Sequence, residues 1–125
     1  MESSCPSIKV VIDQAGINWT TWKVDATITP TSAECFPSKD ASTYKVVATV
    51  KVTSKIDQDI FPFASLSDSI RFQAVTATGV VVGREDVAYR IRRLTRSENV
   101  SASFKELSGS EASRITKIVV GWVYE

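Results

Sequence analysis

Apolar and polar residues alternate along much of the chain with a period of two. The clearest case runs from Thr43 to Thr53, where every second residue is apolar and the intervening residues are mostly Thr and Lys. Such alternation is typical of a β-strand with one buried and one solvated face. The pattern recurs in the segments 22–28, 70–74 and 100–104. The sequence therefore predicts a fold built from half-buried antiparallel strands.

Strands are also expected near both ends of the chain. Ile8 to Ile12 predicts a short first strand, and Ile115 to Tyr124 is apolar at both sets of alternating positions. A strand that is apolar on both faces is typical of the middle of a sheet. Evidence for helices is limited to Ser110 to Arg114, which could form one turn, and Asp86 to Leu94, which could be a strand or a short helix.

Gly, Pro and small polar residues separate these segments. They predict long loops from Pro30 to Asp40 and from Lys55 to Asp68, and a hairpin or bulged strand pair around Thr78-Gly79. We expect an all-β fold, an antiparallel two-sheet β-sandwich of seven or eight strands, with the long loops as crossings between sheets. The length of 125 residues suits a single domain, 1–125. No apolar run is long enough to span a bilayer, so no membrane insertion is expected.

The amino-acid composition excludes more classes of functional site than the net charge of +1 does. The chain has no histidine, which excludes Ser-His-Asp and Cys-His catalytic sets and the His-containing zinc sites. Two cysteines are too few for a four-thiolate metal centre. Asp57 and Asp59 stand without the Gly and Glu of a calcium-binding EF-hand loop. We therefore expect no enzyme activity, no metal and no cofactor.

The two cysteines, Cys5 and Cys35, could form one disulfide bond. The closed loop of about 30 residues would contribute roughly 3–4 kcal/mol of stability and would favour an oxidising compartment. Two unpaired thiols are the alternative. The segment from Met1 to Pro6 does not resemble a signal peptide. An extracytoplasmic location (periplasmic, secreted or cell surface) is expected if Met1 stands where a leader was removed, and an intracellular or virion location if Met1 is the native start.

The stretch from Tyr44 to Tyr124 resembles the immunoglobulin-like extracytoplasmic domains of the FxLYD type. Three segments carry the resemblance, namely Val46 to Val52, Phe72 to Gly83 and the polar turn from Leu107 to Glu111. The chain departs from the family pattern at Thr53-Ser54, where the family has an Asn, and at Thr76 to Thr78, which replaces a Tyr-Asp pair. The resemblance implies an immunoglobulin-like sandwich that serves as an accessory binding module without catalytic residues.

The first candidate site is a cluster of arginines in the segment from Tyr89 to Arg96. Its members are Tyr89, Arg90, Arg92, Arg93 and Arg96. Guanidinium groups suit phosphate, sulfate or carboxylate ligands, and a tyrosine ring could supply stacking. The alternative is an edge strand that is kept soluble by its charges. Because nearby acidic residues offset the charge and no wider basic surface accompanies it, nucleic acid is not favoured as a partner.

The second candidate site is aromatic. Trp19 lies on the opposite face from Trp22 if both belong to one strand, so we expect it to be at least partly exposed. Phe61 and Phe63 form an apolar point inside a polar loop. The alternative is that these rings close the open ends of the sandwich.

The sequence therefore leads to three functional hypotheses, the third of which is an anion or nucleic-acid binder that uses Arg90, Arg92, Arg93 and Arg96. The first is a non-enzymatic, extracytoplasmic binding module that recognises a protein or glycan through surface aromatics and sheet edges. The second is a self-assembling structural subunit of a virion or appendage, a homo-oligomer whose contacts are its edge strands and the segment from Arg90 to Arg96.

Overall fold

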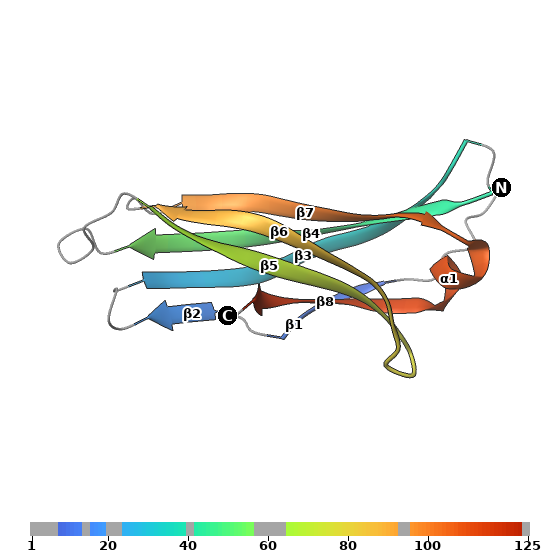
Figure 1. Ribbon diagram of the computed structural model, residues 1–125, viewed down its shortest axis with the longest axis horizontal. Helices are drawn as coiled ribbons and strands as arrows, with labels where there is room; N and C mark the ends of the chain where they lie inside the picture. The colour runs from blue at the N-terminus through green and yellow to red at the C-terminus, as the bar shows by residue number, and fades with distance from the viewer. Residues whose placement is uncertain are drawn as a thin grey trace.

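The described residues form two four-stranded β-sheets that pack face to face, with one short helix at one end (Figure 1). The computed structural model describes residues 8–13, 16–19, 24–39, 42–56, 65–92 and 96–123. The strands are β1 (Lys9–Ile12), β2 (Gly16–Trp19), β3 (Val24–Pro37), β4 (Tyr44–Ile56), β5 (Ser65–Thr76), β6 (Val81–Arg92), β7 (Arg96–Leu107) and β8 (Ile115–Val123), and the helix is α1 (Gly109–Arg114). The predicted all-β, two-sheet sandwich is confirmed.

The strand order leaves four sheet edges. Sheet A has the order β1-β8-β5-β6, and sheet B has the order β2-β3-β4-β7. The chain crosses from one sheet to the other between β1 and β2, between β4 and β5, between β6 and β7, and between β7 and β8. Among the described strands, every pairing is antiparallel except that of β1 with β8.

Alternating apolar residues of both sheets form the core. On β4, the predicted inward positions from Val46 to Val52 are completely buried, and the period continues to Ser54, a buried polar residue. Phe72 and Ile70 of β5 and Ile118 and Val120 of β8 face them from sheet A and are equally buried. Within the described residues, no helix is both long and apolar enough to cross a membrane.

The predicted loop from Pro30 to Asp40 is wrong over most of its length, because β3 continues to Pro37. Proline lacks the N–H group that a central strand needs, and it is tolerated on an edge or at a bulge. β3 offers both conditions. β2 pairs only with residues 24–27 of β3, so β3 is an edge beyond that point, and its register with β4 shifts between Pro30 and Ser32.

The strand expected to contain both Trp19 and Trp22 is also divided. β2 ends at Trp19, whose partner across the ladder is Val24, the first residue of β3. Trp19 and Val24 therefore lie on adjacent antiparallel strands rather than on one strand. The argument that placed Trp19 opposite Trp22 on a single strand is wrong, and Trp22 lies outside the described residues.

The helix α1 contains the turn that the sequence predicts from Ser110 to Arg114. Ser108 caps it, accepting a hydrogen bond from the Glu111 N–H, while the Glu111 carboxylate accepts one from the Ser108 N–H. This reciprocal pair satisfies two backbone donors at the start of the helix. Ala112 is completely buried and fixes the helix against the end of the sandwich.

Candidate functional site

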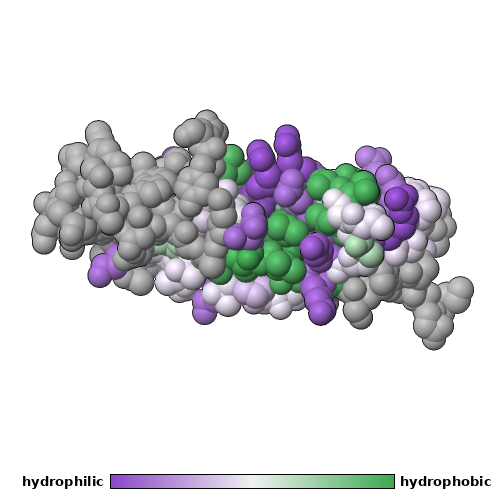
Figure 2. All heavy atoms as spheres, turned by 90° about the horizontal axis from the view of Figure 1, so that it is seen from below, coloured by the Kyte–Doolittle hydropathy of each residue, from purple (hydrophilic) through white to green (hydrophobic). Residues whose placement is uncertain are grey.

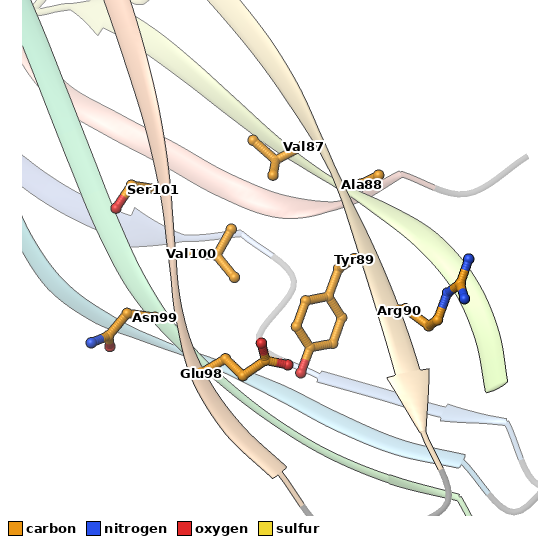
Figure 3. A pocket seen from close by; sticks show the side chains of 8 residues that line it. All are labelled: Val87, Ala88, Tyr89, Arg90, Glu98, Asn99, Val100 and Ser101. Atoms are coloured by element: carbon orange, nitrogen blue, oxygen red, sulfur yellow. The ribbon is translucent and has the colours of Figure 1, made fainter. Parts of the chain in front are cut away.

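The arginine cluster lies where the chain passes from sheet A to sheet B. Arg90 and Arg92 belong to the end of β6, Arg96 begins β7, and Arg93 lies outside the described residues. The side chain of Arg90 is exposed and points toward β5, away from β7 (Figure 3). For Arg92 and Arg96 only the backbone is described. The cluster is therefore split between two sheets instead of lying on one strand.

Tyr89 is a core residue, with 6% of its surface exposed. Its hydroxyl lies 3.0 Å from the Ser54 hydroxyl, which joins β6 of sheet A to β4 of sheet B across the interior. Its ring meets Trp122 edge-on, with the ring centres 6.1 Å apart. So little of the ring is exposed that Tyr89 offers no surface for stacking a ligand. The indole Nε1 of Trp122 is buried and has no hydrogen-bond partner.

A groove of about 330 Å³ lies between β6 and β7, beside Tyr89 (Figure 3). Its walls are residues 87–90 of β6 and 98–101 of β7. Glu98 faces the sandwich interior, because its partner on β4 is the buried Val52. Figure 3 shows the Glu98 carboxylate directed toward Tyr89. The groove therefore has an apolar base and a carboxylate at its side.

The two strands that flank the groove are the last strands of their sheets, and they differ in charge. β6 has five charged residues among its 12, from Arg84 to Arg92. β7 also has charged residues, but only near its ends, and the stretch from Asn99 to Phe104 has none. Charged side chains on an edge strand discourage pairing with other chains. The edge of β7 has much less of this protection than the edge of β6.

Beyond the groove, the edge strands β6 and β7 come into close contact. Gly83 of β6 faces Phe104 of β7, and a Cβ atom at Gly83 would lie 2.9 Å from Cδ1 of Phe104. Residue 83 must therefore be very small for the two edge strands to meet there. Nearby, Glu106 has a left-handed backbone with φ of 56°, where the β7 register with β4 shifts. A β-bulge of this kind ends regular strand pairing.

The outer face of sheet A has a second, smaller hollow of about 170 Å³ between Asp13, Arg71, Gln73 and Gly121. Arg71 donates two hydrogen bonds to the Asp86 carboxylate, at 2.9 and 3.1 Å. The hydrogen bond from Arg71, aided by its charge, lowers the pKa of Asp86, and it raises the pKa of Arg71. Because the guanidinium is already paired, the hollow offers little to an anion.

The exposed apolar residues do not form one continuous face. The large ones are Val11, Phe36, Val80 and Val81. Lys45 lies over the Phe36 ring, with its Nζ 5.9 Å from the ring centre. On the side of the molecule shown in Figure 2, hydrophilic side chains interrupt the apolar surface. The described part of that face therefore presents its apolar side chains in separate groups.

The remaining predicted site residues are placed only in part. The backbone of Trp19 is described but its side chain is not, and Phe61, Phe63 and Cys5 lie outside the described residues. Cys35 is half-buried on β3 and is not a free thiol. Its predicted bond to Cys5 stays a prediction. The described residues contain no group of Cys, Asp and Glu that could hold a metal ion.

Sequence reasoning missed two features of the site. Ser54 continues the alternation of β4 and could have been recognised as an inward position. No sequence signal placed β6 and β7 at neighbouring edges of different sheets. No family model, curated protein sequence or solved structure matches the chain.

Proposed function

We propose that the chain is a non-enzymatic interaction module that binds an extended segment of a protein partner along the edge of β7. The observation that carries the proposal is the uncharged edge from Asn99 to Phe104, which borders the groove beside Tyr89. An edge strand presents unpaired N–H and C=O groups, and an added strand can pair with them.

Main-chain pairing would supply affinity, and the groove would supply selectivity. Alternate side chains of a bound strand point to the same side. On that side they would meet Val87 and Val100, together with the Glu98 carboxylate. The groove of about 330 Å³ is near the lower limit of ligand pockets in general, so it suits one or two side chains rather than a whole small molecule.

The geometry at the two ends of this edge fits a binding segment of limited length. The left-handed Glu106 and its register shift interrupt β7 at one end. At the other end, β7 begins at Arg96, shortly after β6 has ended at Arg92. A partner strand would therefore pair with the uncharged stretch between these points.

Three further expectations from the sequence are kept as proposals. The immunoglobulin-like assignment, including the FxLYD resemblance, is supported by the pairing of β4 with β7 and of β5 with β8, which matches neighbouring strands of immunoglobulin sandwiches. An extracytoplasmic location would suit the bond predicted between Cys5 and Cys35. The absence of histidine supports a role without a chemical step.

Peptide selection tests the proposal. A random peptide library is selected against the immobilised chain, and the enriched peptides are added to the isotope-labelled protein. We expect amide shifts confined to residues 97–104 and the facing residues 87–90. N-methylation at alternate peptide nitrogens should weaken binding about tenfold at the positions that pair. Failure to enrich any peptide, or shifts elsewhere, would overturn the proposal.

Two matched variants locate the binding edge. Asn99 on β7 and Ala88 on β6 are both exposed and both border the groove. Asn99→Lys adds to β7 the kind of charge that β6 already has, so it should weaken peptide binding severalfold, while Ala88→Lys should have a much smaller effect. The opposite order would place the binding edge on β6.

A further inference from the structure

The outer face of sheet A has two adjacent rows, each crossing all four strands, in which cations and valines lie together. The first row consists of the Cα partners Lys9, Lys117, Val75 and Val81. The second row consists of Val11, Val119, Gln73 and Arg84. Both rows alternate along their strands with core positions such as Ile118 and Ala74, so they belong to the outer face. We call them together the mixed rows.

The cations of the mixed rows have no acidic partner among the described residues. Lys9 and Arg84 are exposed, Lys117 is half-buried, and no ion pair between described residues involves them. The described acids on the same face lie beyond the mixed rows, at Asp13 and Asp86. Arg71 already binds the Asp86 carboxylate with two hydrogen bonds. The mixed rows therefore present positive charge to the solvent.

Exposed valines accompany these charges. Val11 and Val81 belong to the mixed rows and are 39% and 48% exposed, and the neighbouring Val80 is 50% exposed. Val80 lies at the tip of the β5–β6 hairpin, which projects from the sandwich (Figure 1). The tip is held in place, because the Val80 N–H donates to the Thr76 hydroxyl at 3.1 Å and Gly79 supplies the required φ of 90°. The fold therefore holds apolar side chains in the solvent beside the cations.

We propose that the mixed rows and the hairpin tip dock on the surface of an anionic membrane, without any part of the chain crossing the bilayer. Anionic headgroups attract lysine and arginine, and partly exposed apolar side chains gain by entering the interface between headgroups and acyl chains. A dissolved polyanion such as nucleic acid would gain from the cations but not from the valines. The combination therefore favours a lipid surface.

This docking surface is separate from the edge proposed to bind peptides. It lies on the outer face of sheet A, whereas β7 is the last strand of sheet B. Membrane docking therefore does not depend on peptide binding, and each can fail without the other.

Co-sedimentation with lipid vesicles tests the charged part of the surface. Vesicles of phosphatidylcholine and phosphatidylserine should bind the chain at low salt, and vesicles of phosphatidylcholine alone should bind it at least tenfold less. Added salt should weaken the binding, because it screens exposed charges. Lys9→Gln and Lys117→Gln should each lower the partition coefficient about fivefold.

Lys51→Gln is the matched control, because Lys51 is exposed on the outer face of sheet B. It removes the same charge and should change the partition coefficient less than twofold. No binding to the anionic vesicles, equal binding to the neutral vesicles, or an equal loss with Lys51→Gln would overturn the proposal.

A second set of variants tests the apolar part. Val80→Ser combined with Val81→Ser should lower the partition coefficient about tenfold. Phe36→Ser should have little effect, because Phe36 is equally exposed but belongs to β3 of sheet B. The urea midpoint of each variant is compared with that of the wild type, so that a loss of fold is not mistaken for a loss of binding. An unchanged partition coefficient in the folded valine variant would overturn the proposal, because charge alone would then account for the attraction.

Discussion

Replacing Gly83 by Ala probes how closely the two edge strands meet. The added methyl group would lie 2.9 Å from Cδ1 of Phe104, whereas carbon atoms prefer a separation of about 3.5–4.0 Å. Phe104 is 4% exposed and packed within the core, so its ring cannot move aside freely. Overpacking of this kind costs about 1–3 kcal/mol. Since Ala is favoured over Gly within a strand by about 0.5–1 kcal/mol, the middle of the two ranges leaves a net loss of about 1 kcal/mol.

Urea unfolding followed by tryptophan fluorescence measures this loss. With a slope of about 2 kcal/mol per molar urea, the midpoint should fall by about 0.5 M. Gly109→Ala is the matched control, because its methyl group would meet Tyr44 at an ordinary 3.6 Å. The Gly109→Ala midpoint should stay unchanged or rise.

A double-mutant cycle isolates the contact. Phe104→Leu alone should destabilise the protein by opening a cavity. In the Gly83→Ala background it should cost at least about 1 kcal/mol less, because the added methyl group then fills part of the space that the ring leaves. Additive effects, or a Gly83→Ala protein as stable as the wild type, would refute the proposed packing of β6 against β7.

Three other predictions follow from single residues. The lowered pKa of Asp86 means that its ion pair with Arg71 stabilises the fold above about pH 4 and is lost as the pH falls through the pKa of the folded state. The stability difference between wild type and Asp86→Asn, measured by urea unfolding, should therefore shrink below about pH 4. A difference that stays constant with pH would contradict this. Glu106→Asn should raise stability by about 0.5–1 kcal/mol in the same assay, because Asn tolerates the left-handed backbone at φ 56° better than Glu does. Thiol titration of the unfolded, unreduced protein should find no free thiol if Cys5 is bonded to Cys35, and two free thiols would disprove the bond.

Local patterning was sufficient to identify most strands, because burial of one sheet face imposes a period of two on the sequence. The alternation around Val50 predicted β4, and the apolar run at the end of the chain predicted that β8 is central. The same reasoning failed where tertiary context overrides a local rule. Proline is incompatible with a strand that is paired on both sides. At Pro30, however, β3 is paired with β4 on one side only.

The candidate site was harder to predict from the sequence than the fold was. Tyr89 lies among charged residues and was expected at the surface, yet it occupies an inward position and is hydrogen-bonded to Ser54, 35 residues earlier. The groove depends on β6 and β7 being edges of different sheets. Strand order follows from long-range pairing, which no local pattern encodes. The charge difference between the two edges was present in the sequence, but it had no meaning until the edges were known.

The parallel pairing of β1 with β8 also determines how the fold responds to mechanical force. Lys9 at the start of β1 lies beside Lys117 near the start of β8, so the two free ends of these strands point in opposite directions. Tension applied to the two ends of the chain would pull β1 and β8 past one another along their length. The hydrogen bonds between them would then resist together in shear, whereas an antiparallel pair pulled in the same way would open one bond at a time. Once Cys35 is reduced, the short β1–β8 ladder would therefore bear the load when the chain is stretched, and its rupture would detach β1 before the rest of sheet A opens.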